Sequence, residues 1–593
     1  MLRLAVAQVR PTKGEYAANV QQLGAVLAQV AQLEPSIDLV VFPEAATSGY
    51  FVEGGVREVA VTAGTLVRDL DLARGSADTR PIDVAVGFYE VFQNSLYNSS
   101  LYATLGGKEA GIHHVHRKVF LPTYGVFDEQ RFVERGHDVR AFDTHWGRAA
   151  LLICEDAWHS LTAALAALDG AQVIIVPSAS PARGTGEGAG LPGSLVRWER
   201  IVRSIAEEHG VYVVYASLVG FEGGKGFPGG SVVVGPQGDI LVRGPLFEEA
   251  IVTAEVNLDE ITRARAEAPL LADLRTALPD LIKNLGKREG GRGKSKATKA
   301  KFDAARDGAK PLVSRPPSPV PESDPLRLDV ELAHRWLVSF LKDEVVARRG
   351  FTKGIVALSG GVDSSLTAFL AAEALGRENV IGVRIPYRTS SPESLEHAQL
   401  VIDKLGIPSV TVDISETVDA YLRAVGDADP ARKGNVMARE RMIALFDLSA
   451  KHRALPLGTG NKSERLLGYF TWHADDTPPV NPLGDLFKTQ VWALARHVGV
   501  PDVIVTKPAT ADLIHGQTDE GDFGISYQKA DRILYYLISG FGPEQVVGLG
   551  FTRAEVDLVR NRLESTHWKR KLPTVAVMSQ TAIGEFYLRP VDY

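Results

Sequence analysis

A stretch from residue 286 to residue 325 differs in kind from the chain on either side of it. Between Lys287 and Lys310 it carries nine Lys or Arg against three Asp or Glu, and the sequence SRPPSPVPESDP follows. Such a segment cannot bury enough apolar surface to offset the entropy that it loses on ordering. A basic run can also bind RNA or an acidic surface, but a solvated linker is the commoner case. We therefore expect a mobile or extended linker over 286–325, between one domain over 1–285 and another over 326–593.

Composition limits what these two domains can be. The 593 residues are 45% hydrophobic and 23% charged, which is ordinary globular composition on a length that exceeds one core. The formal net charge of −7 would repel a polyanion, so nucleic acid is not an expected partner. The opening sequence MLRLAVAQVRP lacks the features of an export signal, and no apolar run approaches the ~20 residues of a membrane span. We expect a cytoplasmic protein without membrane contact.

Both domains are predicted to be of the α/β class. Before the linker, short apolar runs such as LRLAVAQV, DLVVF and VIIVP alternate with helical patterns, and the last runs are separated by turns such as GPQG. These features predict layered sheets of mixed strand direction. After the linker, the order strand, helix, strand repeats from GIVAL to SVTVD, which predicts a doubly wound parallel sheet. Ligands of such sheets bind beyond the carboxyl ends of the strands.

Three reactive residues of the first domain each follow a predicted strand: Glu44, Lys118 and Cys154. If they converge, they can break an amide: the thiolate attacks the carbonyl carbon, the carboxylate moves the proton, and the ammonium stabilises the anionic intermediate. Cys154 is the only cysteine, so it forms no internal disulfide. Taken alone, a cysteine after an apolar strand is more often a small core residue than a nucleophile.

The surrounding motifs resemble those of the nitrilase, or carbon-nitrogen hydrolase, family over nearly all of residues 1–265. They are FPEAATSGY, HRKVFLPTYGVFDEQRFVERG and LLICEDAW, in that order. The resemblance implies a four-layer α-β-β-α sandwich in which Glu44, Lys118 and Cys154 form the catalytic triad, with Glu129 as a second glutamate. It also implies that the backbone N–H of Glu155 helps to form the oxyanion hole, and that Tyr124 and Ser180 contact glutamine.

Three histidines, His113, His114 and His116, precede the lysine motif. On a strand only two of them share a face, and no further ligand is obvious nearby. We interpret them as polar or surface side chains with ordinary partners, not as a metal site.

The second domain contains a phosphate-binding pattern that is not a Walker loop. The run from Ser359 to Ser365, SGGVDSS, joins the strand GIVAL to a helix. Small residues let the backbone approach a phosphate, and the free N–H groups at the helix start attract the anion. No lysine of the Walker type is present, which disfavours γ-phosphate hydrolysis of that style. As a bare pattern, a glycine-rich turn is often only a tight turn.

This loop resembles the signature of the PP-loop ATP pyrophosphatases, which adenylate a substrate and release pyrophosphate. Further segments from Arg384 to Pro573, including RIPYRTSSPESLEHA, GTGNKSERLLGYF and NPLGDLFKTQ, resemble the synthetase domain of the glutamine-dependent NAD synthetase family. The resemblance implies that ATP adenylates the nicotinate carboxylate of deamido-NAD, that ammonia from glutamine displaces AMP, and that the chain forms a homo-oligomer.

The same resemblance carries over particular residues. ATP and its pyrophosphate would contact Ser359, Gly360, Gly361, Asp363, Ser364, Ser365, Arg439 and Thr459. Mg²⁺, an oxygen-seeking cofactor, would be held by Asp363 and Glu464. Deamido-NAD or the transferred phosphate would contact Asn435, Asp485, Lys488, Lys569 and Arg570. The sequence departs from the family pattern at His397, which replaces an aspartate, and in the stretch PARGTGEGAGLPG after Ser180.

Two alternatives remain open at this stage. One is another PP-loop amidotransferase that acts on a nucleotide or a tRNA base, against which the PYRTSS, GTGNKSE and NPLGDLFKTQ segments argue. The other is a nucleotide-sensing protein with two dead sites, against which the intact triad and loop argue. We also expect an enclosed path for ammonia between the two sites, because protonated ammonia is a poor nucleophile and an acyl adenylate hydrolyses if it waits.

Overall fold

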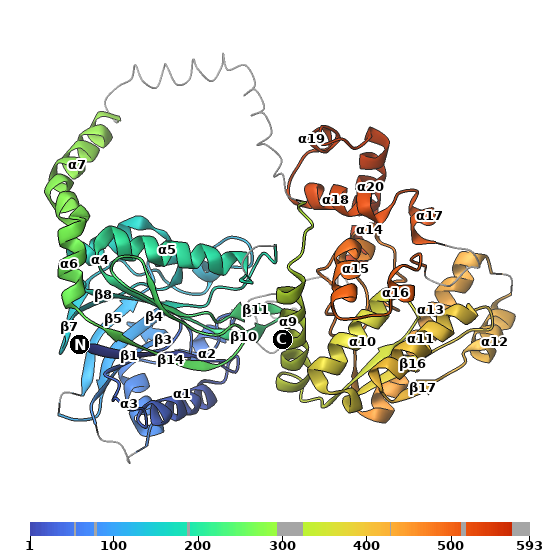
Figure 1. Cartoon of the computed structure of the whole chain (residues 1–593), viewed down its shortest axis with the longest axis horizontal. Coiled ribbons are helices and arrows are strands. Elements are labelled where there is room, and N and C mark those ends of the chain that lie inside the picture. Colours follow the sequence, from blue (N-terminus) through green and yellow to red (C-terminus); the bar gives the residue numbers. More distant parts are fainter. Residues whose placement is uncertain are drawn as a thin grey trace. The chain divides into compact units, whose positions relative to one another are not determined.

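The computed structural model describes residues 1–52, 55–75, 80–108, 110–186, 190–292, 324–426, 428–510 and 518–571. These residues fall into two compact units, one built mainly from the chain before residue 293 and the other from the chain after residue 323 (Figure 1). Among the described helices, none combines the length and the apolar character that a membrane span requires.

The first unit contains two six-stranded sheets. One has the order β14-β1-β2-β3-β4-β5, in which β1, β2 and β3 are parallel and the other neighbours antiparallel. The other has the order β13-β12-β9-β8-β7-β6, in which β7, β8 and β9 are parallel. The strands are β1 (Leu2–Gln8), β2 (Leu39–Val41), β3 (Ile82–Phe92), β4 (Ser95–Leu105), β5 (Gly111–Arg117), β6 (Ala141–Thr144), β7 (Gly147–Leu151), β8 (Val173–Ser178), β9 (Tyr212–Ser217), β12 (Val232–Val234), β13 (Ile240–Arg243) and β14 (Ala250–Val256).

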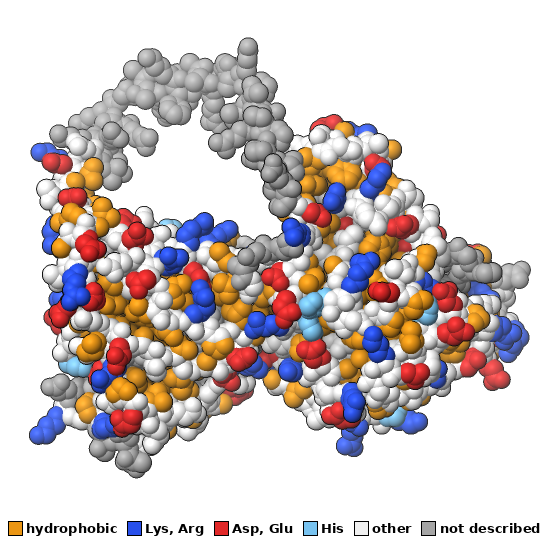
Figure 2. Space-filling view, viewed as in Figure 1, with side chains coloured by type: hydrophobic (Ala, Val, Ile, Leu, Met, Phe, Trp, Pro, Cys, Tyr) orange, Lys and Arg blue, Asp and Glu red, His pale blue; other side chains and the backbone are white. Residues whose placement is uncertain are grey.

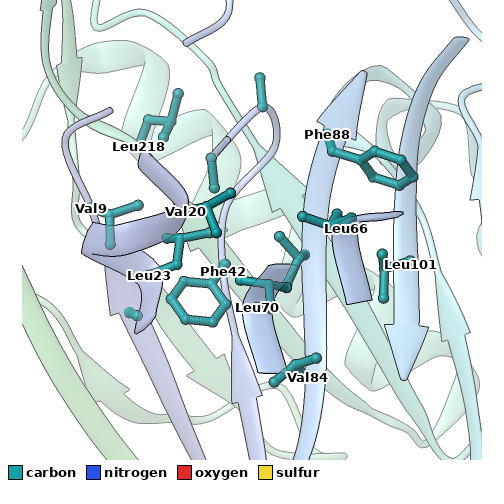
Figure 3. Close-up of a cluster of buried hydrophobic side chains, with 14 of the residues drawn as sticks. Val9, Val20, Leu23, Phe42, Leu66, Leu70, Val84, Phe88, Leu101 and Leu218 are labelled. Carbon is teal, nitrogen blue, oxygen red and sulfur yellow. The ribbon is translucent and has the colours of Figure 1, made fainter. Parts of the chain in front are cut away.

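The two sheets pack face to face, with helices on their outer faces. The inner core joins side chains such as Leu4 and Val41 of the first sheet to Leu151 and Ile175 of the second. On the outer face of the first sheet, helices α1 (Tyr16–Val30) and α3 (Ala63–Ala73) pack against β3 and β4 (Figure 3). Helices α4 (Ser160–Leu168) and α5 (Gly193–His209) pack together on the second sheet, where α5 contacts β9 and β12. The predicted α-β-β-α sandwich is confirmed.

A short hairpin stands outside both sheets. Strands β10 (Val219–Glu222) and β11 (Lys225–Pro228) are antiparallel, and Glu222 pairs with Lys225 across the turn. Gly223 and Gly224 form this turn with φ angles of 57° and 76°. Two successive positive φ angles are typical of the tight hairpin turn that glycine adopts without strain. The hairpin tip is therefore well defined, and both of its end residues approach the first site.

The second unit is built on a parallel sheet with the order β17-β16-β15-β18. Helices cover both faces: α9, α10, α11 and α15 pack on one, and α12 and α13 on the other. The predicted doubly wound domain is confirmed. The elements are α9 (Val330–Leu341), β15 (Lys353–Ala357), α10 (Val362–Leu375), β16 (Val380–Arg384), α11 (Pro392–Leu405), β17 (Ser409–Thr411), α12 (Ser415–Val425), α13 (Pro430–His452), β18 (Ala454–Pro456) and α15 (Lys488–His497).

A group of helices with its own apolar core completes the second unit. Its core includes Leu467, Phe523, Leu534 and Val559. The helices are α14 (Lys462–Leu467), α17 (Asp519–Phe523), α18 (Tyr527–Ile538), α19 (Pro543–Val547) and α20 (Arg553–Ser565). Helices α14 and α17 also carry polar residues of the second site, Glu464 and Asp519, so this group of helices forms part of that site.

Helix α7 (Leu270–Arg292) reaches into the first residues of the predicted linker. Its earlier part, up to Leu285, is rich in Leu and Ala, which are strong helix formers. The predicted boundary at residue 285 stays a prediction. The rest of the predicted linker up to residue 323 lies outside the described residues. The smaller helices of the two units are α2 (Val56–Val59), α6 (Asp259–Glu267) and α16 (Asp502–Val505).

The surface carries both signs of charge. On the face drawn in Figure 2, Lys and Arg side chains are interspersed with Asp and Glu side chains over both units. Exposed opposite charges of this kind interact weakly, because water and salt screen them. Buried ion pairs also occur, for example between Lys118 and Glu44 and between Lys488 and Asp363.

Candidate functional sites

The first site lies where strands of the first unit end. Glu44 follows β2, Lys118 follows β5 and Cys154 follows β7, although the three are far apart in sequence. Lys118 Nζ lies 2.7 Å from Glu44 Oε1 and 2.7 Å from Glu129 Oε2. The side chains of Glu44 and Lys118 are fully buried, and that of Glu129 nearly so. The structure thus brings the four predicted catalytic residues into one cluster.

Cys154 occupies a tight turn at the edge of this cluster. Its φ is 44°, a left-handed value that costs a residue other than glycine roughly 1–3 kcal/mol and occurs mostly at functional sites. The Ser178 hydroxyl lies 3.4 Å from Cys154 Sγ, and the next residue, Ala179, donates its N–H to Glu44 Oε2 at 2.7 Å. Two successive residues at the end of β8 therefore hold the thiol and the carboxylate beside each other.

The electrostatics of the cluster show which groups carry charge. Burial raises the pKa of Cys154, the Glu44 carboxylate raises it further, and Lys118 opposes both. Burial would lower the pKa of Lys118, but Glu129 and Glu44 outweigh it and hold this pKa well above the usual range. Burial raises the pKa of Glu129, and Lys118 opposes it. The surroundings thus favour the cationic form of Lys118 and the protonated form of the Cys154 thiol.

Sequence reasoning missed two side chains that complete the cluster. Asn98, on β4, donates one amide hydrogen bond to Glu44 Oε1 at 2.8 Å and another to Glu129 Oε1. The Tyr50 hydroxyl donates to Glu129 Oε2 at 3.1 Å. Tyr50 belongs to the FPEAATSGY motif, so its motif was visible in sequence, whereas Asn98 sits in the strand SLYNSSLYATL with no distinguishing signal.

Asp156 ties the lysine motif to the cysteine turn. It is fully buried, and its carboxylate accepts from the N–H groups of Val119 and Phe120 at 3.0 Å each and from Ile153 at 3.1 Å. His116 Nε2 lies 2.8 Å from the same carboxylate. Asp156 thus joins the residues after Lys118 to the residue before Cys154. His116, one of the three histidines of β5, is a buried polar side chain with a partner.

Tyr124 and Glu155 lie together near the thiol. The Tyr124 hydroxyl donates to Glu155 Oε2 at 2.7 Å, and burial with this hydrogen bond raises the pKa of Tyr124 to about 12. Tyr124 remains 55% exposed. Ser180 is half-buried and directly follows Ala179. The Arg183 guanidinium lies 3.2 Å from where a side chain on Gly125 would begin. Tyr124 and Glu155, two of the predicted glutamine contacts, therefore lie together, with Arg183 beside the adjacent Gly125.

A cavity of about 330 Å³ adjoins this cluster. Its walls are mainly aromatic and aliphatic, and Asp128, Glu129 and Lys225 supply charge. Residues lining it include Tyr50, Phe51, Tyr89, Phe127, Phe132, Glu129 and Lys225. Cys154 is not among its lining residues, so the cavity reaches the cluster only through Glu129 and Tyr50.

The phosphate loop of the second unit connects β15 to α10. Ser364 Oγ accepts from the N–H of Ser359 at 3.2 Å, and Ser365 Oγ donates to the Gly361 carbonyl at 2.8 Å. Gly360 has a φ of 77°, and a Cβ there would lie 2.1 Å from the carbonyl oxygen of Ser394. The close approach of α11 to the loop therefore requires glycine at position 360.

Three carboxylates surround a single buried lysine beside this loop. Lys488 Nζ contacts Asp363 and lies 3.2 Å from Glu464 Oε1, and Asp519 lines the same cavity. Burial would lower the pKa of Lys488, but Asp363 and Glu464 raise it well above the usual range. Burial, opposed by Lys488, raises the pKa of Glu464 to about 8. Lys488, Asp363 and Glu464 thus form one ionic cluster beside the phosphate loop.

A cavity of about 440 Å³ holds most of the predicted second site. The predicted residues that line it are Ser359, Gly361, Asp363, Ser364, Thr459, Glu464, Lys488 and Lys569. It also contains Arg441, Lys507 and Asp519, which we did not predict. All three lie within the span from Arg384 to Pro573 that resembles the synthetase domain, but the resemblance did not single out these side chains.

Other predicted residues lie away from this lining. They are Gly360, Ser365, Arg439, Asn435, Asp485 and Arg570. The Asp485 side chain is 97% exposed and pairs with Lys462. The Arg570 guanidinium donates to the carbonyls of Leu466 at 3.0 Å and Leu563 at 2.7 Å, which fastens it to helix ends. Contacts of these six residues with substrate stay predictions.

Comparison with known proteins gives the family. The carbon-nitrogen hydrolase family model matches residues 3–266, and the NAD synthase model matches residues 333–573. The chain is 31% identical, over all of its length and 98% of the relative's, to a glutamine-dependent NAD(+) synthetase of Thermotoga maritima. Residues amounting to 45% of the chain are 45% identical to an NH3-dependent NAD(+) synthetase of Trichlorobacter lovleyi, of which 98% is covered.

A solved structure agrees with both halves. The glutamine-dependent NAD+ synthetase of Acinetobacter baumannii, solved in complex with ADP, superposes with a TM-score of 0.67 over 98% of this chain and 96% of its own, at 25% identity. A nitrilase-like hydrolase with a Cys-Glu-Lys cluster, fused to a PP-loop nucleotide-binding domain, defines an ATP-dependent amidotransferase. The chain belongs to the glutamine-dependent NAD synthetase family.

Proposed function

We propose that Cys154 is the nucleophile that releases ammonia from glutamine. Glu44 takes the thiol proton while Sγ attacks the side-chain carbonyl carbon, and Lys118 with the Glu155 N–H stabilises the oxyanion. Glu44 then protonates the departing ammonia, and water hydrolyses the thioester to glutamate. The observation that carries this proposal is the buried 2.7 Å contact of Lys118 with Glu44 beside the thiol. Ser178 binds the Cys154 thiol, and the next residue, Ala179, binds the Glu44 carboxylate.

The proposed substrate contacts of this site lie around the exposed Tyr124. Tyr124 and Ser180 would face the glutamine side chain, and Arg183 would bind its α-carboxylate. The support for Arg183 is its guanidinium beside Gly125, next to the Tyr124–Glu155 pair. A planar guanidinium matches a carboxylate through two parallel hydrogen bonds.

In the second unit, the nicotinate carboxylate of deamido-NAD attacks the α-phosphorus of ATP, and pyrophosphate leaves. Ammonia then attacks the acyl adenylate and displaces AMP. The loop from Ser359 to Ser365 would hold pyrophosphate through its N–H groups and hydroxyls, with Thr459 on the ATP side and Lys488 and Lys569 near the phosphates. Arg439, Asn435, Asp485 and Arg570 complete the proposed contacts.

Mg²⁺ fits the donor set of this cavity. Asp363 and Glu464 present oxygen atoms around one ammonium, and Mg²⁺ is usually bound by one or two carboxylates together with phosphates and water. When bound, the ion supplies positive charge that neutralises the phosphates. Asp363 and Glu464 would hold it, and Asn461, which donates to Asp363 at 2.9 Å, keeps that carboxylate in place.

Wider proposals concern the whole chain. We propose domains over 1–285 and 326–593, in an enzyme that works in the cytoplasm as a homo-oligomer. We also propose that ammonia travels between the sites by an enclosed path. The path is supported by chemistry, since ammonia becomes a poor nucleophile once it is protonated in bulk water. If added unlabelled ammonium dilutes glutamine-derived ¹⁵N in the product in proportion to its concentration, the path does not exist.

Product analysis tests the function as a whole. The purified protein with glutamine, ATP, deamido-NAD and Mg²⁺ should form NAD, glutamate, AMP and pyrophosphate, with one AMP per NAD. Formation of ADP and phosphate in place of AMP and pyrophosphate would contradict adenylation. Absence of glutamate would contradict the role of Cys154.

A further inference from the structure

Glu222, at the tip of the β10–β11 hairpin, lies outside the catalytic cluster but contacts its support. It is 4% exposed, and its two carboxylate oxygens accept the N–H groups of Tyr50 and Phe51 at 3.0 Å and 2.8 Å. Hydrogen bonds to an ionised group are about twice as strong as those between neutral groups. One side chain thus fixes two successive peptide groups from a position more than 170 residues later in the chain.

The local backbone is shaped for this contact. Gly49 has a φ of 75°, and a Cβ there would lie 2.9 Å from Glu222 Oε1. On the other side of the hairpin turn, Lys225 places its ammonium 4.2 Å from the centre of the Phe51 ring. The tip of the hairpin therefore holds residues 50 and 51 through a carboxylate at one end of the turn and an ammonium at the other.

Tyr50 carries the constraint from Glu222 to the catalytic cluster. Its carbonyl accepts from the Tyr89 hydroxyl at 2.8 Å, so the peptide groups on both sides of Tyr50 are held. Its own hydroxyl donates to Glu129 Oε2 at 3.1 Å, and its ring centre lies 5.5 Å from Lys118 Nζ. With the backbone fixed, the hydroxyl can reach Glu129 only from one direction.

We propose that Glu222 is a positioning residue of the glutaminase site, which fixes the Tyr50 backbone so that the Tyr50 hydroxyl orients Glu129 against Lys118. This inference rests on the proposed glutaminase function of Cys154. Glu129 shares Lys118 with Glu44, so a change in the orientation of Glu129 alters how firmly Lys118 is held by Glu44. Glu222 acts on the reaction without touching substrate.

Glu222→Gln is the variant of choice, because it keeps the size of the side chain and one accepting oxygen. The other oxygen becomes an NH₂ group, which faces a backbone N–H that needs an acceptor. We expect kcat for glutamine hydrolysis to fall about tenfold with KM little changed, and NAD formation from ammonium to be unaffected. Glu222→Ala should cost about a hundredfold. Glu255→Gln, which breaks an exposed pair with Arg3 in the same unit, is the matched control and should change neither activity.

A double-mutant cycle with Tyr50→Phe separates positioning from simple support of the fold. If Glu222 acts through the Tyr50 hydroxyl, Glu222→Gln should cost much less in the Tyr50→Phe background than in the wild type. The acidic limb of the glutamine-hydrolysis pH profile should also move to higher pH in Glu222→Gln, because a lost donor to ionised Glu129 favours its protonated form. A fold defect alone predicts neither result.

Each outcome decides the inference. Three results would each overturn the role of Glu222. They are rate losses of Glu222→Gln and Tyr50→Phe that simply add in the double variant, an unchanged rate in Glu222→Gln, and a parallel loss of ammonium-driven activity. A wild-type protein that hydrolyses no glutamine would instead refute the proposed function of Cys154, so the two failures are distinguishable.

Discussion

Both sites of this chain hold a buried lysine between two carboxylates, but they differ in how open that cluster is. In the first, Lys118 contacts Glu44 and Glu129 inside a nearly sealed cluster. In the second, the carboxylates of Asp363 and Glu464 share one lysine beside a cavity of about 440 Å³. The first is preorganised for covalent chemistry by its own side chains, whereas the second is completed by the charges of its ligands.

Removal of the ammonium should break the first site most severely. In Lys118→Met the oxyanion loses its cation, and we expect glutamine-driven NAD synthesis to fall about 10³-fold. Ammonium-driven synthesis should persist, because the second site does not depend on Lys118. The comparison uses kcat/KM with each nitrogen source, with Lys283→Met on the exposed face of α7 as control. An equal loss of kcat/KM with both nitrogen sources would mean that Lys118 supports the whole fold and not the first site alone.

Gly360→Ala should disable the second site and spare the first. The added methyl group would meet the Ser394 carbonyl at 2.1 Å, and the φ of 77° is unfavourable for alanine. We expect synthesis with either nitrogen source to fall about a hundredfold, since the loop can no longer keep its shape around phosphate. Gly499→Ala is the matched control, because Gly499 has a similar φ of 82° in the same unit and its Cβ would meet no heavy atom of the described residues within 4 Å. Similar losses in the two variants would show that the approach of α11 is not the cause.

Asp156→Asn tests how the first site is held together. The new amide cannot accept from all the N–H groups that the carboxylate now binds, so the free energy of unfolding of the first unit should fall by about 2 kcal/mol. Glutamine hydrolysis should fall about tenfold, because the Cys154 turn loses its tie to the lysine motif. Urea unfolding and glutamate release measure the two effects. Asp138→Asn, in an exposed pair with Arg140, should change stability by less than about 0.5 kcal/mol, and a similar loss there would contradict the account.

The smallest expected effect is a change in the titration of the single thiol. The Glu44 charge raises the pKa of Cys154, so Glu44→Gln should lower it and increase the thiolate fraction at neutral pH. The apparent pKa from the pH dependence of iodoacetamide alkylation should therefore move down, while glutamine hydrolysis is lost with the base. Because Cys154 is the only cysteine, the alkylation signal has one source. An unchanged or higher apparent pKa would show that Glu44 does not face the thiol electrostatically.

The sequence predicted the fold and the central catalytic residues, but not the residues that hold them in place. Motifs after predicted strands located Glu44, Lys118 and Cys154, because parallel strands end at one edge of a sheet. Asn98, Asp156 and Glu222 escaped notice, because their roles come from contacts with residues distant in the chain. These are ordinary polar residues in strands and turns until the fold supplies the N–H groups that they bind.

Motif resemblance says little about which partners a charged side chain has in the folded chain. The Arg570 guanidinium donates to backbone carbonyls at the ends of α14 and α20, and the exposed Asp485 side chain pairs with Lys462. The substrate contacts predicted for both residues stay predictions. Helix α7 continues to Arg292, into the first residues of the predicted linker, whose bounds also stay a prediction.

The division of labour between the two sites is tested most directly by Cys154→Ala assayed with glutamine and, separately, with ammonium. The account predicts that glutamine-driven NAD formation falls to background while ammonium-driven formation keeps its wild-type rate. Loss of both activities in a folded protein, or survival of the glutamine-driven one, would contradict it.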